Sequence, residues 1–177
     1  QPTVAYLIEP RFPGGTSSAV AAELEAVHSL AKIEVHGLKT AMFPDNRIST
    51  QISDAIMRLG IPFYCDSAEV SADIVILHNP SCLKFQDTLN FKVIARHLIV
   101  VTHENFLRPG GAPGFDVEKC LSMIASKSLV LSRSLAPISR HNRMTVQNWK
   151  RMTGAADDWT ILPEDWFNIC ASTVSPP

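Results

Sequence analysis

Short apolar runs alternate with longer amphipathic stretches along the chain. Each run is too short for a helix of its own and has the length of a strand buried in a sheet. The stretches between them repeat apolar residues every three or four positions, as a helix does when one side faces a core. Strands are therefore predicted at 3–8, 33–38, 61–64, 73–77, 98–102, 129–131 and 159–162, and helices at 16–31, 49–59, 81–96, 116–124 and 137–152.

Polar residues, glycine and proline predict how these elements begin and end. A hydroxyl at positions 16–18 is expected to cap the first helix, with Glu23 in its early turns. Gly60 is expected to end the second helix, and Pro62 places the next strand at the periphery. The inward stripe of the last predicted helix is Ile138, Asn142, Thr145, Trp149 and Met152.

Strands that alternate with helices pair in parallel, because the helix carries the chain back across the sheet. The predicted fold is therefore a Rossmann-like three-layer α/β domain with a mainly parallel sheet of about seven strands. At 177 residues, 46% hydrophobic and 19% charged, the chain has the length and composition of one globular domain and not of a disordered segment or coiled coil. We assign this domain to residues 1–170 and the start of a linker or tail to 171–177.

The net charge of −1 gives no general attraction to nucleic acid, and no nucleic-acid partner is expected. The charge is nevertheless uneven, because residues 119–151 contain no acid. This basic segment has two interpretations, a solvated helix surface or a patch that faces an anion such as a membrane surface. Its basic residues are Lys119, Lys127, Arg133, Arg140, Arg143, Lys150 and Arg151.

Four cysteines lie far apart at positions 65, 82, 120 and 170, without a C-x-x-C pair. This spacing favours buried thiols over a disulfide framework or a zinc site, and so a reducing, cytoplasmic compartment. The apolar runs are too short to span a bilayer. Any membrane contact is therefore expected to be peripheral, at the inner face, through the basic segment.

Candidate chemistry is sought after each strand, because ligands of open parallel sheets gather at the carboxyl edge where strand order reverses. Gly14 and Gly15 follow the first strand, and Thr16 opens the next helix. Paired glycines at this place let backbone amides approach a ligand closely. The alternative is that the glycines only form a turn, which also needs glycine. The segment is neither G-x-G-x-x-G nor a P-loop, which disfavours a nucleotide dehydrogenase or an NTPase.

Two histidines occupy matching strand ends. His78 and Asn79 follow the fourth strand, while His103, Glu104 and Asn105 follow the fifth. A polar structural role and a functional role are both open for them. As a functional group, His103 would hydrogen-bond a sugar hydroxyl or a phosphate, or relay a proton. No metal-ligand spacing supports a metal site from His78, His103 and Glu104, and we expect neither a metal nor another cofactor.

The serines near the sixth strand, at 132 and 134, flank Arg133. They are not in a G-x-S-x-G context, so a hydrolase nucleophile is not expected. Arg133 is expected at a strand end, and Arg140 and Arg143 along one flank of the following helix.

Taken in order, these motifs resemble the N-terminal domain of GT-B fold glycosyltransferases, in particular the retaining group 1 family. The resemblance rests on a Pro-x-x-Gly-Gly loop, an Asp-led strand ending in His, a hydrophobic-Thr-x-His-like element, a strand leading into a basic helix, and an Ile-Pro-x-x-like end. In this chain they are Pro10 to Val20, Asp73 to His78, Val100 to Glu104, Leu129 to Arg143 and Ile161 to Phe167.

The resemblance implies the acceptor-side half of an enzyme that transfers a sugar from a nucleotide-sugar donor with retention, in glycan, lipopolysaccharide or exopolysaccharide synthesis. In the family a second domain holds most of the donor and supplies a Glu-x7-Glu pair; the chain ends before such a domain, so residues 1–177 alone are expected to be inactive. His103 is the expected catalytic residue. The expected substrate-binding residues are Gly14, Gly15, Thr16, His78, Asn79, Glu104, Asn105, Arg133 and Arg140, which would meet the donor and a sugar or lipid-linked acceptor. The alternative is a Rossmann-like binding or interaction module without catalysis.

Overall fold

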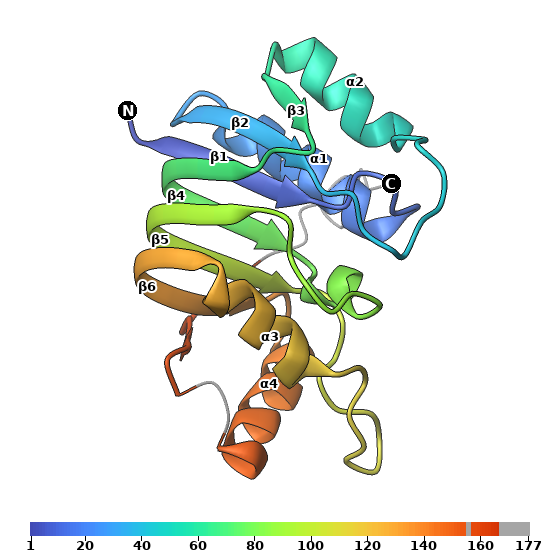
Figure 1. The fold of residues 1–177 in the computed structure, drawn as a ribbon, viewed down its shortest axis with the longest axis vertical. Helices are drawn as coiled ribbons and strands as arrows, with labels where there is room; N and C mark the ends of the chain where they lie inside the picture. The colour runs from blue at the N-terminus through green and yellow to red at the C-terminus, as the bar shows by residue number, and fades with distance from the viewer. Residues whose placement is uncertain (155–156, 167–177) are drawn as a thin grey trace, which may run out of the picture.

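A seven-stranded, all-parallel sheet forms the centre of the protein (Figure 1). The computed structural model describes residues 1–154 and 157–166. The strand order β3-β2-β1-β4-β5-β6-β7 confirms the predicted Rossmann-like class and strand number. The strands are β1 (Thr3–Ile8), β2 (Lys32–Gly37), β3 (Phe63–Cys65), β4 (Glu69–His78), β5 (Lys92–Thr102), β6 (Ser128–Pro137) and β7 (Thr160–Ile161).

Helices cover both faces of the sheet and complete the three layers (Figure 1). One face packs against α1 (Gly15–Val27) and α2 (Thr50–Leu59), and the other against α3 (Val117–Ser126), α4 (Arg140–Thr153) and the short 3-10 helix η1 (Pro80–Leu83). Side chains of a strand alternate between the faces. In β1, Tyr6 therefore belongs to the core beneath α1, whereas Leu7 belongs to the core on the opposite face.

The helix predicted at 81–96 is wrong. Only η1 forms there, and β5 already begins at Lys92. Leu89, Phe91 and Val93 are all buried at a spacing of two, which is the period of extended chain and not of a helix. Asp87, Thr88 and Asn90 between them favour turns over helix.

Three central strands are longer than predicted and bend sharply. β4, β5 and β6 have ten, eleven and ten residues, and Figure 1 shows that their first halves turn back at one side of the sheet. Val70 and Val93 in these first halves join the same apolar core as Leu7 and Leu77. The bent strands thus cover part of a sheet face themselves.

Several local predictions also need correction. α1 begins at Gly15 with Gly14 as its N-cap, so no Ser or Thr hydroxyl caps it. Met152 is 65% exposed and lies outside the inward stripe of α4, which instead includes the buried Val146. Cys82 and Cys120 are buried free thiols as predicted, but Cys65 is exposed. Cys170 and the linker assigned to 171–177 lie outside the described residues.

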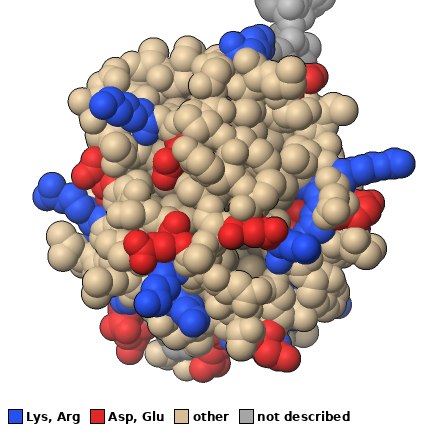
Figure 2. Space-filling model, turned by 45° about the horizontal axis from the view of Figure 1, so that its top comes forward, with Lys and Arg blue, Asp and Glu red and all other residues tan. Residues whose placement is uncertain are grey.

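The basic segment is largely engaged within the protein. Lys119 pairs with Asp87, and Arg143 pairs with Asp165. Lys150 donates to the Trp159 carbonyl, and Arg151 to Asn148. On the face drawn in Figure 2, acidic and basic side chains are interspersed. No helix in the described part of the chain has the length and apolar composition needed to cross a membrane.

Candidate functional site

The candidate site lies at the carboxyl edge of the sheet, beside the point where strand order reverses. β1 leads through α1 to β2 on one side, whereas its other neighbour, β4, leads to β5 on the opposite side. This arrangement is the topological switch point at which open parallel sheets bind ligands. His78 ends β4, and His103 directly follows β5.

A chain of three side chains, buried at Glu23 and His78 and half-buried at His103, connects α1 to this edge. The carboxylate Oε2 of Glu23 lies 3.1 Å from Nε2 of His78, and Nδ1 of His78 lies 2.9 Å from Nε2 of His103. The contact between Glu23 and His78 has the distance of an ion pair, but its geometry is not that of a well-aligned hydrogen bond. The strand-end prediction thus brought together the two histidines, and the structure adds the glutamate behind them.

Glu23 is held by donors from three separate parts of the chain. Tyr6 in β1 donates its hydroxyl to Oε1 at 2.9 Å, and the indole N–H of Trp166 donates to Oε2 at 2.9 Å. His78 contacts Oε2 from β4, and its ring stacks at 6.0 Å on that of Tyr6. These contacts fix the carboxylate of Glu23, a residue that is only 7% exposed.

The surroundings favour an ionised Glu23 and a neutral His103. Burial opposes ionisation of Glu23, but its hydrogen bonds and the neighbouring His78 outweigh burial, so the pKa of Glu23 lies below its usual value. Burial, and then the charge of His78, lower the pKa of His103 to about 3 against a smaller opposing effect of Glu23. Burial next to Glu23 also raises the pKa of Tyr6. His103 is therefore a neutral imidazole at neutral pH.

Two proton arrangements satisfy the contact between the histidines, because one nitrogen must donate and the other accept. When His78 is neutral and its Nε2 proton faces Glu23, its Nδ1 accepts from His103 and leaves Nδ1 of His103 as an acceptor. When His78 is an imidazolium, Nδ1 of His103 carries a proton and donates instead. Among the described residues, Nδ1 of His103 has no hydrogen-bonding partner. The buried chain therefore sets what this nitrogen offers to a ligand.

Asn142 of α4 holds the turn that carries His103. Its carboxamide oxygen accepts from the buried hydroxyl of Thr102 at 2.5 Å, and its N–H groups donate to the Glu104 carbonyl at 3.1 Å and to Asn105 at 3.3 Å. The residues on both sides of His103 are thereby fixed to α4, Thr102 through its side chain and Glu104 through its backbone. The Asn105 side chain has a structural contact here, while the half-buried Glu104 carboxylate makes no hydrogen bond to a described residue.

The glycine pair opens α1 at the same edge of the sheet. Gly14 adopts φ 80°, a conformation that favours glycine, and space is open beside both glycines. No side chain caps the helix, so first-turn amides at Gly15 and Thr16 are not satisfied by a cap. Such amides are suited to an anionic group.

A buried clamp anchors the loop between β1 and these glycines. The 4%-exposed Glu9 binds Arg11 through both carboxylate oxygens, at 2.7 and 2.8 Å, and accepts from the hydroxyl of Thr40 at 2.6 Å. Ser17 of α1 donates to the Phe12 carbonyl at 2.5 Å. The loop is therefore tied both to the segment after β2 and to α1.

The structure places the three remaining predicted residues, Arg140, Arg133 and Asn79, in different surroundings. Arg140 is exposed at the start of α4 and lies at the carboxyl edge. Arg133 does not follow a strand end as predicted; it lies within β6, roughly 13 Å before the end of that strand, and contacts Ser128 and the Ala125 carbonyl. Asn79 is buried and accepts from Ser81, so it shapes the turn after His78.

Metal ligands do not gather at this edge: within residues 1–154 and 157–166, no three His, Cys, Asp or Glu side chains are placed to hold one ion. The side chains that the sequence interpretation missed are Glu23, Tyr6, Trp166 and Asn142 as members of the site. A polar residue on an apolar helix stripe was the available signal for Glu23, between Val20 and Leu24, and for Asn142.

Comparisons with protein-family models, with curated proteins and with solved structures find no significant match.

Proposed function

We propose that the chain is the acceptor-side half of a retaining glycosyltransferase, which transfers a sugar from a nucleotide-sugar donor to a hydroxyl-bearing acceptor. The observation that carries this proposal is the neutral imidazole of His103 at the switch point, held from behind by His78 and Glu23. The ordered motifs that resemble the group 1 family support the same interpretation.

The proposed chemistry uses His103 as a hydrogen-bonding group for the transferring sugar. The bond between the anomeric carbon and the donor phosphate oxygen breaks, and the bond to the acceptor oxygen forms. The acceptor proton leaves with the released nucleotide. A neutral imidazole suits this step because it binds a sugar hydroxyl without adding a charge to the pocket.

The amides that open α1 supply the second part of the proposed site. Gly14 and Gly15 leave open space beside the helix start, where the donor phosphates would approach. On this proposal most donor contacts come from a second domain. Arg140, exposed at the same edge, is proposed to meet an anionic portion of the acceptor or a membrane surface.

The test uses the full parent protein and a panel of nucleotide sugars, with release of the nucleotide as the readout. His103→Ala is expected to lower kcat/KM by about 10- to 100-fold, the effect of losing one or two hydrogen bonds in the transition state. Met57→Ala, an exposed change on α2, is the matched control. Turnover by residues 1–177 alone, or full activity of His103→Ala, would contradict the proposal. Absence of donor consumption by the parent protein would favour the non-catalytic binding module.

A further inference from the structure

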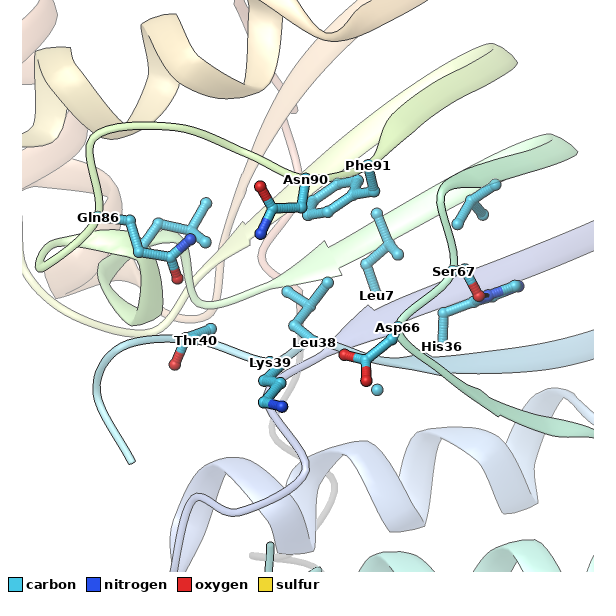
Figure 3. A pocket seen from close by; sticks show the side chains of 13 residues that line it. Leu7, His36, Leu38, Lys39, Thr40, Asp66, Ser67, Gln86, Asn90 and Phe91 are labelled. Carbon is cyan, nitrogen blue, oxygen red and sulfur yellow. Dashed lines mark hydrogen bonds between the residues drawn. The ribbon is translucent and has the colours of Figure 1, made fainter. Parts of the chain in front are cut away.

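A second concave site lies on the opposite face of the sheet from His103. It is a cavity of about 270 Å³ between the end of β2, the turn before β4 and the loop before β5 (Figure 3). Its floor includes Leu7, Leu38 and Phe91, which all belong to the core that does not contain Tyr6. Ligands in this cavity would therefore not contact the Glu23–His78–His103 chain.

The fold explains why this cavity exists. The chain passes from β3 to β4 through three residues, 66–68, so this connection provides no helix to cover β1 and β2 on that face. The first half of β4 and the loop before β5 cover it instead, through Val70 and Phe91. A bent strand and a loop fill less space than a helix, which leaves the cavity between them and Leu7.

Three exposed polar side chains at the cavity make no hydrogen bond and no close ion pair to a described residue, although one of them, Asp66, lies within the electrostatic influence of Arg11. They are Lys39, Asp66 and Asn90, which come from three different segments. Figure 3 shows Asn90 on one side of the opening and Lys39 and Asp66 on the other. Asp66 adopts a positive φ of 54°, a conformation that only a few residue types tolerate. The other polar lining residues are already engaged, since His36 binds Ser67 and Gln86 binds the Thr88 carbonyl.

The combination of these groups selects a class of ligand. A simple anion would be repelled by Asp66, and a simple cation by Lys39. A hydrocarbon would remove water from all three polar groups without replacing their hydrogen bonds. Hydroxyl groups both donate and accept, so neighbouring hydroxyls can satisfy a carboxylate, an ammonium and a carboxamide together.

The size and floor of the cavity narrow the class further. Its volume lies just below the range of about 300–1,000 Å³ that holds drug-sized ligands, so it suits one ring and not a chain of rings. The apolar floor of Leu7, Leu38 and Phe91 suits the C–H face of such a ring. We infer that this cavity is a binding site for a neutral hexose ring, recognised by Lys39, Asp66 and Asn90 over that floor. The inference goes beyond the proposed transferase and does not depend on it.

The test follows methyl resonances of Leu7 and Leu38 by NMR in residues 1–177 during separate titrations with glucose, galactose, mannose and N-acetylglucosamine. At least one of these hexoses is expected to give saturable shifts at both methyl groups with a millimolar Kd. L-leucine tests a zwitterion, and inorganic phosphate tests an anion. If none of the four hexoses shifts these methyl groups, or if only L-leucine or phosphate does, the inference is wrong.

Two variants test the polar rim. Asp66→Asn removes the charge but keeps a residue that tolerates positive φ, and it is expected to weaken hexose binding by about tenfold. Asn90→Trp places a large ring at the opening and is expected to abolish the shifts. The controls are Glu118→Gln, a charge loss on α3, and the exposed Met57→Trp on α2. Unchanged binding in both rim variants would overturn the assignment.

A third variant separates this site from the proposed active site. His103→Ala lies on the other side of the sheet and is expected to leave the hexose titration at Leu7 unchanged. Failure of the transferase assay would therefore leave the hexose result standing, and failure of the hexose titration would leave the transferase proposal standing.

Discussion

Removal of the Glu23 side chain is expected to destabilise the protein strongly, even though the residue is charged. Glu23→Ala leaves the Tyr6 hydroxyl and the His78 ring without their acceptor, and both residues are almost fully buried, at 1% and 2% exposure. Each buried polar group that loses its partner costs about 1–3 kcal/mol. The expected loss in the free energy of unfolding is therefore about 3–5 kcal/mol, the range found when a buried ion pair loses one member.

Glu23→Gln separates the charge from the hydrogen bonds. The carboxamide keeps the size of the side chain, and one oxygen still accepts from Trp166 or faces His78. Its N–H group can donate to the Tyr6 hydroxyl, because a hydroxyl accepts as well as donates. The expected loss is smaller, about 1–2 kcal/mol, since mainly the ionic part is removed.

The assay is urea unfolding followed by far-UV circular dichroism at pH 7. Glu25→Ala is the matched control, because Glu25 lies on the same helix but pairs with Arg58 at the exposed surface. Such surface pairs contribute little, so its unfolding curve should stay close to that of the unmodified chain. The reasoning about the buried chain is refuted if Glu23→Ala unfolds at the same urea concentration as Glu25→Ala.

Three further predictions concern residues around the same edge. The pKa of His103 is about 3 in the folded protein and near 6.5 in the unfolded chain. The stability that this difference contributes is therefore fully present above pH 6.5 and falls by up to about 1.4 kcal/mol per pH unit below it. His103→Gln should make the urea midpoint depend less on pH between pH 7 and pH 5, and an unchanged dependence would contradict this pKa. Gly14→Ala should cost about 1–2 kcal/mol because of its positive φ, whereas Gly15→Ala should be neutral or stabilising, and thermal unfolding of the two variants should differ in that direction. Asn142→Ala should lower the free energy of unfolding by about 1–3 kcal/mol. The double variant with Thr102→Val should lose less than the sum of the two single variants, and additive losses would argue against coupling of the two residues.

The hydrophobic pattern predicted the fold well where strands are buried on both faces. β1, with five buried residues in a row, and the carboxyl halves of β4 and β5 are of this kind. The pattern failed where strands bend and one side meets solvent. Arg96 and His97 of β5 are exposed, and such polar positions interrupt the apolar run that marks a buried strand.

The same distinction explains how much of the site the sequence could predict. His78 and His103 follow strands, and the parallel topology alone brings their strand ends together. Glu23 was interpreted only as a favourable charge in the early turns of α1, although its position between Val20 and Leu24 places it on the buried side of that helix. What the sequence does not show is which groups this carboxylate meets, because Tyr6 and His78 come from β1 and β4, which are distant in sequence.

The energetic balance of this buried chain bears on its purpose. Removing a carboxylate from water costs several kcal/mol, and the three donors around Glu23 mainly offset that cost. Apolar residues of similar volume would fill the space beneath α1 without this desolvation cost. What the polar chain supplies instead is a defined orientation for His78 and, through a 2.9 Å contact, for His103. A fixed neutral imidazole is suited to a ligand that hydrogen-bonds to its free nitrogen. On the function proposed above, the chain from Glu23 to His103 orients this nitrogen for binding at the carboxyl edge of the sheet.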